Sequence, residues 1–153
     1  MRSNLSQEYI EKTPFSLHVK VHKNHSRIIF KADKNYLYSK NLPGTLPILK
    51  KNLPAIFFTK CINDNNYCFE EEAKNTEIAH LFEHIILTYL CLRKKIQEQN
   101  DFLYKAKTSW NWEKNEIGNF EIDLNVGLDE EKGLLWAIGK SRTLLSRIYS
   151  FNN

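Results

Sequence analysis

Glycine and proline are scarce in this sequence, with 5 glycines and 4 prolines among 153 residues. This low content excludes a collagen-like chain and a low-complexity disordered chain, because both need far more of these two residues. Only three cysteines are present, and no two of them form a CxxC pair. We therefore expect neither a disulfide framework nor a zinc site built from thiolates.

Long apolar runs and blocks of like charge are also missing. No stretch approaches the roughly 20 apolar residues of a membrane span, and the first residues lack the apolar segment of a signal peptide. The chain has 22 Lys and Arg against 18 Asp and Glu, and this net charge of +4 is spread along the sequence. A nucleic-acid-binding arm would concentrate its basic residues. We expect a soluble, cytoplasmic protein whose partners include neither nucleic acid nor membranes.

The rest of the composition is that of an ordinary folded protein, with 42% hydrophobic and 26% charged residues. A length of 153 residues corresponds to one domain, since domains usually have about 100–200 residues. No segment rich in Pro, Gly or Ser divides the chain. The sequence therefore predicts a single domain over residues 1–153, in which the polar residues 1–13 form a loose N-terminal arm.

Alternation of apolar and polar residues predicts several β-strands. It is clearest in Phe15–Val21, where every second side chain is apolar, and residues 27–32 then have the pattern of the returning strand of a hairpin. Residues 102–112 and 120–126 show the strand pattern again, with a hairpin loop between them. The apolar run Ile-Phe-Phe within residues 54–61 predicts a buried strand.

Helical periodicity predicts two long helices and a short one. The strongest pattern covers residues 76–98, with Asn75 or Thr76 as the N-cap, and its centre is apolar nearly all round, as is typical of a buried helix. A second long helix is predicted over residues 129–148, capped by its first residue, and a short one over residues 46–52. Together these elements predict an α+β fold: a mostly antiparallel β-sheet with two long helices and one short helix packed on one face.

The buried helix contains the sequence His80-Leu81-Phe82-Glu83-His84. Residues four apart lie on the same face of a helix, so the two histidines can coordinate one zinc ion at Zn–N distances of about 2.0–2.1 Å. Glu83 lies close to the same face, where it can act as a general base on a metal-bound water. HxxEH is the inverted form of the HExxH motif of zinc proteases. The sequence thus predicts a zinc site with His80 and His84 as ligands and Glu83 as the general base.

A structural or degenerate role of this group is the alternative, because a histidine beside apolar residues is more often a core residue satisfied by one hydrogen bond. Two observations favour metal binding. Two histidines and a glutamate in this spacing are rare by chance in a chain with only five histidines. Burying three ionisable groups in an apolar helix is also costly unless they are paired or bind a metal.

Several segments resemble the N-terminal domain of cyanophycin synthetases. They are Leu42-Pro43-Gly44, Leu53-Pro54 leading to Cys61, residues 76–85 with the HxxEH pattern, residues 119–123 and residues 129–134. The resemblance covers residues 40–147. It implies a domain that docks a peptide polymer and that, in some members, acts as a zinc peptidase which cuts this polymer.

The sequence departs from these synthetases in two respects. The synthetases continue into an ATP-grasp ligase and a Mur-ligase-like domain, whereas this sequence stops and has no P-loop pattern GxxxxGK[ST], so ATP-driven ligation is not implied. The segment Thr108-Ser109-Trp110-Asn111-Trp112 also differs from the glycine- and arginine-rich segment of the family. Pitrilysin-type peptidases share the HxxEH motif, which gives a second and looser resemblance.

A catalytic zinc ion usually has three protein ligands and one open position. In pitrilysin-type peptidases the third ligand is a glutamate far downstream, and this chain offers Glu113, Glu116, Glu121, Glu130 and Glu131. We favour Glu131, because the final helix is best placed to pack beside the HxxEH helix. A favourable interaction with the N-terminal end of its own helix explains Glu131 equally well. Cys68, shortly before the HxxEH helix, is an alternative ligand.

Two functions are consistent with these patterns, whereas a third, a LuxS-like lyase in which HxxEH also binds a metal, finds no match in the rest of the sequence. The first is a zinc-dependent metallopeptidase or amidase that acts on a peptide or polypeptide substrate, with zinc as its cofactor. The second is a non-catalytic binding or accessory module related to the polymer-docking domain. Trp110 and Trp112, two residues apart in a predicted strand, would line a substrate cleft or, in the more usual role of such residues, pack in the core.

Overall fold

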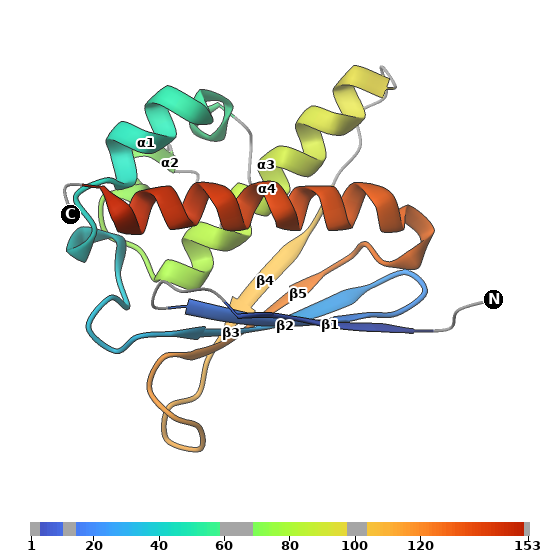
Figure 1. Cartoon of the computed structure of the whole chain (residues 1–153), viewed down its shortest axis with the longest axis horizontal. Coiled ribbons are helices and arrows are strands. Elements are labelled where there is room, and N and C mark those ends of the chain that lie inside the picture. The colour runs from blue at the N-terminus through green and yellow to red at the C-terminus, as the bar shows by residue number, and fades with distance from the viewer. Residues whose placement is uncertain (1–3, 11–14, 59–68, 98–103, 152–153) are drawn as a thin grey trace.

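The computed structural model describes residues 4–10, 15–58, 69–97 and 104–151, and its base is a five-stranded antiparallel sheet (Figure 1). The strands lie in the order β1-β2-β3-β5-β4, so β1 and β4 are the edge strands. Their bounds are Leu5–Ile10 for β1, Phe15–Val21 for β2, Ser26–Ala32 for β3, Ala106–Ser109 for β4 and Asn119–Leu124 for β5.

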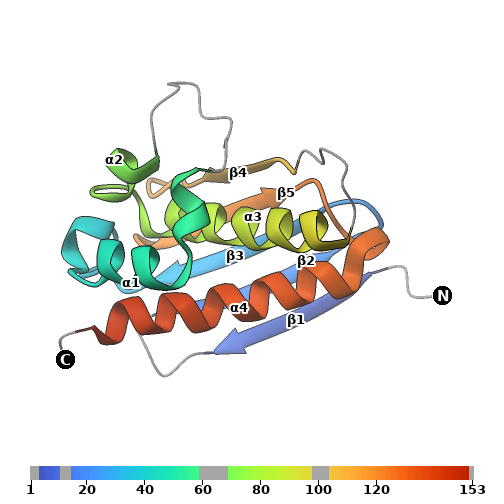
Figure 2. The ribbon, with the colours of Figure 1, turned by 90° about the horizontal axis from the view of Figure 1, so that it is seen from above.

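Helices cover one face of this sheet (Figures 1 and 2). Their bounds are Thr45–Asn52 for α1, Phe69–Ala73 for α2, Ile78–Gln97 for α3 and Glu131–Ser150 for α4. The predicted α+β class, with a mostly antiparallel sheet and helices packed on one face, is confirmed, and α2 is an additional short helix. Within the described part of the chain, no helix has the length and the apolar character that a membrane crossing requires.

The core lies between the sheet and the two long helices. On the inner face of the sheet, Val19, Ile28 and Ile122 lie opposite one another on β2, β3 and β5, and all three are fully buried. α3 and α4 cover this face with apolar residues, among them Phe82 and Ile138. Burying one such side chain stabilises the fold by about 1.5–3 kcal/mol. The apolar faces that alternation and helical periodicity predicted therefore meet in one core.

The prediction of a loose arm over residues 1–13 is wrong for its central part, because Leu5–Ile10 is strand β1. β1 pairs with β2 in antiparallel register, with Gln7 opposite Val19. The side chains from Leu5 to Tyr9 are exposed or half-buried, because β1 lies at the edge of the sheet. A strand with so little burial needs no strict alternation, and its sequence therefore shows none.

The predicted buried strand over residues 54–61 is also wrong. Pro54–Phe57 forms a 3-10 helix with the proline in its first turn, where the missing N–H has no helical partner to lose. Of the three consecutive apolar residues, Ile56 is buried whereas Phe58 is 83% exposed. Residues 59–61 lie outside the described part of the chain. A continuous apolar run thus did not distinguish a strand from a short helix.

Both long helices begin two residues later than predicted. The N–H of Ser39 donates to the carbonyl of Thr76 at 2.8 Å, and the N–H of Thr76 donates to Oγ of Ser39 at 2.9 Å. These bonds tie the backbone of Thr76 to a distant segment, and its hydroxyl contacts the ring of His80 and does not cap a backbone N–H of α3. Asp129 likewise accepts the N–H of Gly127 at 2.9 Å, so its carboxylate does not cap α4.

Candidate metal centre

The first turns of α3 are buried on nearly all sides, because the sheet, α4 and the 3-10 helix Pro54–Phe57 all contact this helix. Glu83 and His84 lie within this apolar segment and are only 6% and 2% exposed, whereas His80 is half-buried. Their fully buried neighbours on the helix are Leu81, Phe82, Ile85 and Ile86. The group thus has one side, at His80, that solvent can reach.

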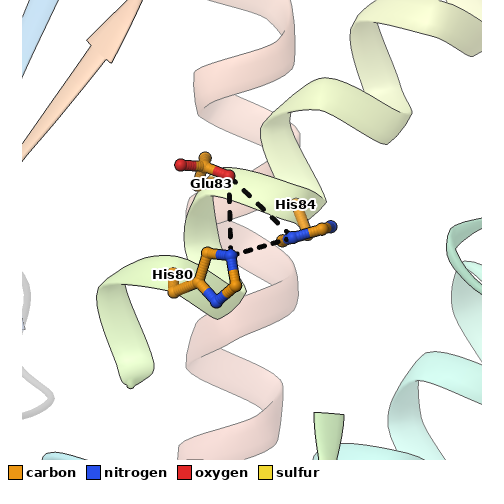
Figure 3. A group of neighbouring side chains, drawn as sticks. All are labelled: His80, Glu83 and His84. Carbon is orange, nitrogen blue, oxygen red and sulfur yellow. Dashed lines mark hydrogen bonds and ion pairs between the residues drawn. The ribbon is translucent and has the colours of Figure 1, made fainter. Parts of the chain in front are cut away.

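One ligand-type atom from each of three residues converges here (Figure 3). The Nε2 atoms of His80 and His84 are 3.0 Å apart. Oε2 of Glu83 lies 3.8 Å from Nε2 of His80 and 3.9 Å from Nε2 of His84. Within the part of the chain that the structure describes, this is the one group of three or more such residues that is close enough to hold a metal ion.

The separations fit a small divalent cation. A circle through three points that are 3.0, 3.8 and 3.9 Å apart has a radius of about 2.1 Å, so one position lies at this distance from all three atoms. Zinc is bound by imidazole nitrogen at about 2.0–2.1 Å and by carboxylate oxygen at about 2.0–2.2 Å. Two imidazoles and one carboxylate are also a donor set that zinc accepts in proteins. The three side chains therefore can hold a metal ion.

The ring of His80 is oriented by contacts at Nδ1, the ring nitrogen that does not face the group. Nδ1 of His80 is 2.8 Å from Oγ1 of Thr76 and 3.5 Å from Oε1 of Glu72. The hydroxyl of Thr76 donates to Oε2 of Glu77 at 3.4 Å, so its oxygen accepts from His80. We therefore assign the proton of the neutral ring to Nδ1, which leaves the lone pair of Nε2 for the centre. Such a second contact commonly fixes the ring of a metal-binding histidine.

His84 is held in its neutral form. Burial, with a smaller contribution from His80, lowers the pKa of His84 to about 3. The ring of Phe69, from α2, stacks on the ring of His84 with a centroid distance of 4.0 Å, which fixes the ring plane. A neutral imidazole keeps a lone pair for a metal ion. His84 is therefore neutral throughout the physiological pH range. Without a metal ion its Nε2–H donates to Nε2 of His80 at 3.0 Å, so this proton has to move to Nδ1 when Nε2 binds an ion.

Glu83 is held from the sheet. The hydroxyl of Thr108, on β4, donates to Oε1 of Glu83 at 2.9 Å. Burial raises the pKa of Glu83 above its ordinary value, and His80 and Thr108 only partly oppose this rise. Oε1 is thus fixed by β4 while Oε2 faces the histidines. A carboxylate with a raised pKa is suited to take up a proton.

The sequence identified the three residues of the group but not the residues that orient them. Thr108 is 25 positions from Glu83, and Phe69 and Glu72 belong to α2, a helix that was not predicted. A threonine in a short strand carries no local signal of such a contact. The acidic run at residues 70–72, shortly before the motif, was the one usable indication, because carboxylates often orient metal-binding histidines.

The structure does not bring the predicted third ligand, Glu131, into this group. Its neighbour Glu130 accepts hydrogen bonds from Lys94 at 3.2 Å and from Tyr104 at 3.0 Å, so α4 begins beside the C-terminal part of α3. Lys94 lies about 20 Å further along α3 than His80, at 1.5 Å per residue. α4 packs beside α3 as expected, but its acidic first turn lies near the opposite end.

The other sequence candidates are also elsewhere or outside the described residues. Glu121 lies 3.8 Å from the guanidinium of Arg27 in a largely exposed ion pair, and Cys68 lies outside the described part of the chain. The predicted strand over residues 102–112 is present as the shorter β4, so Trp110 and Trp112 follow it. Both tryptophan rings contact the buried ring of Phe120, at 5.6 and 5.4 Å between centroids.

Neither a scan against models of known protein families nor a search of curated proteins gives a match to this sequence.

Proposed function

We propose that His80, Glu83 and His84 form the zinc centre of a hydrolase that cleaves amide bonds in peptides. The observation that carries this proposal is the convergence of one atom from each residue, all within 4.8 Å of one another, in an otherwise apolar helix. His80 and His84 hold the ion through their Nε2 atoms. Zinc, when bound, lowers the pKa of water to about 7 and polarises a carbonyl group.

Glu83 is the general base of this proposal. Thr108 occupies Oε1 and so leaves Oε2 turned toward the two histidines. The raised pKa of Glu83 brings its carboxylate closer to the pH at which one group can both accept and return a proton. Glu83 takes a proton from the attacking water and delivers it to the amine that leaves when the amide bond breaks.

The same distances favour a second candidate. Because Oε2 of Glu83 can lie as close to the ion as the two Nε2 atoms, Glu83 can be the third ligand itself. The group would then have no free base, and the chain would be a metal-dependent binding module without catalysis. This candidate corresponds to the polymer-docking role that the resemblance to cyanophycin synthetases implies.

Zinc titration of the metal-free protein, followed by calorimetry, tests what both candidates share. We expect one zinc ion per chain in the wild type and loss of this binding in His80→Ala. His18→Ala is the matched control. It also removes a histidine, but His18 lies on β2 and bonds to Ser6 on β1, away from the metal centre. A wild-type chain that binds no zinc would contradict both candidates.

Glu83→Gln separates the two candidates, because glutamine keeps the shape of the side chain but cannot take up the proton. If Glu83 is the base, zinc affinity remains and hydrolysis of a broad peptide mixture falls by about 10²–10⁴-fold. If Glu83 is a ligand, zinc affinity falls and the wild type cleaves no peptide. Glu121→Gln, which changes a carboxylate paired with Arg27, is the control for both measurements.

A further inference from the structure

The face of the sheet that lies away from the helices has a pocket near one end. Ile29 on β3, Glu121 on β5 and Ser109 on β4 lie opposite one another in the sheet. Their strand neighbours Phe30 and Phe120 belong to the core and are fully buried, so this row of three residues faces the other side. Together with residues of the loop that joins β4 to β5, the row lines a pocket of about 270 Å³.

The loop over residues 110–118 supplies the second wall of this pocket. In Figure 1 it extends from the sheet on the side away from the helices. The N–H of Asn115 donates to the carbonyl of Asn111 at 2.9 Å, which fixes the turn of the loop. Nε1 of Trp112 donates to the carbonyl of Asn119 at 3.0 Å, which ties the loop to the start of β5. The pocket is therefore preformed, as small-molecule sites usually are.

Three neutral polar side chains line the pocket. Within the described part of the chain, the hydroxyl of Ser109 and the side-chain amides of Asn115 and Asn119 take part in no hydrogen bond. An amide provides an acceptor and two donors, and a hydroxyl provides both functions on one oxygen. These side chains can therefore bond to a ligand whose polar groups both donate and accept.

The charges around the pocket favour an uncharged ligand. Among the described residues that line it, none is basic and Glu121 is the one acidic residue. The carboxylate of Glu121 lies 3.8 Å from the guanidinium of Arg27, which also bonds to Asp123 at 2.8 Å. An anion would be repelled by Glu121, and a cation would compete with Arg27 for this carboxylate. A neutral molecule avoids both costs.

Apolar surface completes the pocket. Ile29 and Trp110 both line it, and Trp110 is 44% exposed. The ring of Trp110 is held by the rings of Phe120 and Trp112, at centroid distances of 5.6 and 6.1 Å. An indole held in this way offers a flat apolar surface at little further cost in side-chain entropy. A sugar ring has the matching chemistry, because it combines C–H groups on its faces with hydroxyl groups around its rim.

We propose that this pocket binds one sugar ring of an uncharged carbohydrate. Its volume of about 270 Å³ lies just below the roughly 300–1,000 Å³ of pockets that enclose drug-sized ligands, so it admits a single ring. The sugar hydroxyl groups bond to the three neutral polar side chains, and its C–H groups lie against Ile29 and Trp110. A nucleotide fits less well, because its phosphates need basic partners. This site lies across the sheet from α3 and does not depend on the proposed zinc centre.

Nuclear magnetic resonance of the indole N–H groups tests the proposal. The chain has 3 tryptophans, and their signals are assigned with Trp110→Phe and Trp112→Phe. The probes are the methyl glycosides of glucose, galactose, mannose and N-acetylglucosamine, with free uracil and inorganic phosphate as competing classes. A ligand of one ring is expected to bind with a Kd of about 1 mM. We expect at least one glycoside to shift the Trp110 signal in a saturable way and to leave the signal of Trp136, on α4, unchanged.

Asn115→Ala tests the pocket from the protein side. Loss of one hydrogen-bonding amide should weaken the binding of that glycoside by about three- to tenfold. The variant should fold, because Asn115 is exposed and bonds to Asn111 through its backbone. Asn24→Ala is the matched control, since Asn24 is also an exposed asparagine in a hairpin connection but lies at the other end of β3.

The sugar titrations need no zinc, so their outcomes are separate from those of the zinc experiments. A saturable shift of the Trp110 signal that Asn115→Ala weakens and Asn24→Ala does not would support the sugar site, whether or not the protein binds zinc. No saturation by any glycoside up to about ten times the expected Kd would overturn it. Equal shifts of all three indole signals, an affinity that Asn115→Ala leaves unchanged, or saturation by uracil or phosphate alone would overturn it as well.

Discussion

The two long helices of this protein have the same length and lie on the same face of the sheet, yet only α3 buries a carboxylate and an imidazole there. α3 and α4 each have 20 residues. The buried hydroxyl of Ser141 on α4 bonds to the carbonyl of Ala137 in its own helix, at 2.7 Å. On α3, the buried Glu83 accepts a hydrogen bond from Thr108 of β4, and the buried His84 bonds to the half-buried ring of His80.

This difference indicates that the two helices have different roles. A buried polar group that is satisfied within its own helix costs little, whereas buried ionisable groups weaken a fold unless they are well paired. α4 behaves as a packing element. α3 carries an arrangement that packing does not require, which is the pattern expected where stability is lowered in favour of a binding or catalytic site.

The largest expected effect on stability comes from a substitution in α4, the packing helix. Ile138→Ala removes a fully buried side chain from α4 and should lower the free energy of unfolding by about 2–5 kcal/mol, measured by denaturant titration. Zinc affinity at 25 °C should stay unchanged, because Ile138 is not part of the metal group. A marked loss of zinc affinity in the folded variant would mean that the two helices do not have separate roles.

Zinc itself should stabilise the fold through α3. At a free zinc concentration 100 times the dissociation constant, binding to the folded state alone adds about 2.7 kcal/mol to the free energy of unfolding. Thermal unfolding with and without zinc measures this gain, which His84→Ala should abolish. Ser141→Ala, at a buried polar position of α4, is the matched variant and should keep the zinc-dependent shift.

Replacing the buried carboxylate should stabilise the metal-free protein. Glu83→Met combined with Thr108→Val removes both partners of one hydrogen bond and fills similar volumes. We expect a gain of about 1–4 kcal/mol in chemical unfolding without zinc, together with loss of any hydrolytic activity. A destabilised double variant would show that the pair supports the fold, as an ordinary core contact does.

The smallest expected effect concerns the stability of the fold at alkaline pH. Burial, with further contributions from Asp33 and Tyr36, raises the pKa of Tyr149 on α4. The unfolded chain therefore releases this proton first, and stability falls by about 1.4 kcal/mol per pH unit above pH 10. Tyr149→Phe should reduce this slope in unfolding measured from pH 9 to about 11. An unchanged slope would assign the loss to other groups.

The secondary structure was predictable where burial of one face imposes a regular spacing of apolar residues. Phe15–Val21 alternates strictly because β2 lies inside the sheet with one face on the core, and the prediction matches the strand. β1, at the edge, buries too little to show a period. The run around Ile56 is apolar without a period, so its pattern predicts a strand where the chain forms a 3-10 helix.

The candidate site was predictable only in its local part. His80, Glu83 and His84 lie within about one turn of one helix, so their spacing alone places them together. Thr108 reaches the site through the pairing of β4 with β5, which depends on the whole sheet. The packing of the two long helices beside each other predicts Glu131 as a ligand, but a sequence does not tell which end of a helix lies beside which end of its neighbour.

The order of the strands also determines when the sheet can be completed during synthesis of the chain. β3 pairs with β5, whose residues follow about 90 positions later, as with Ile28 and Ile122. At about 5–20 residues per second, the ribosome needs about 5–20 seconds to supply that partner strand. Until then the first three strands and α3 emerge without β5 or Thr108, so Glu83 lacks the hydroxyl that holds its carboxylate in the folded protein. The candidate metal centre is thus assembled only after β4 and β5 have been made.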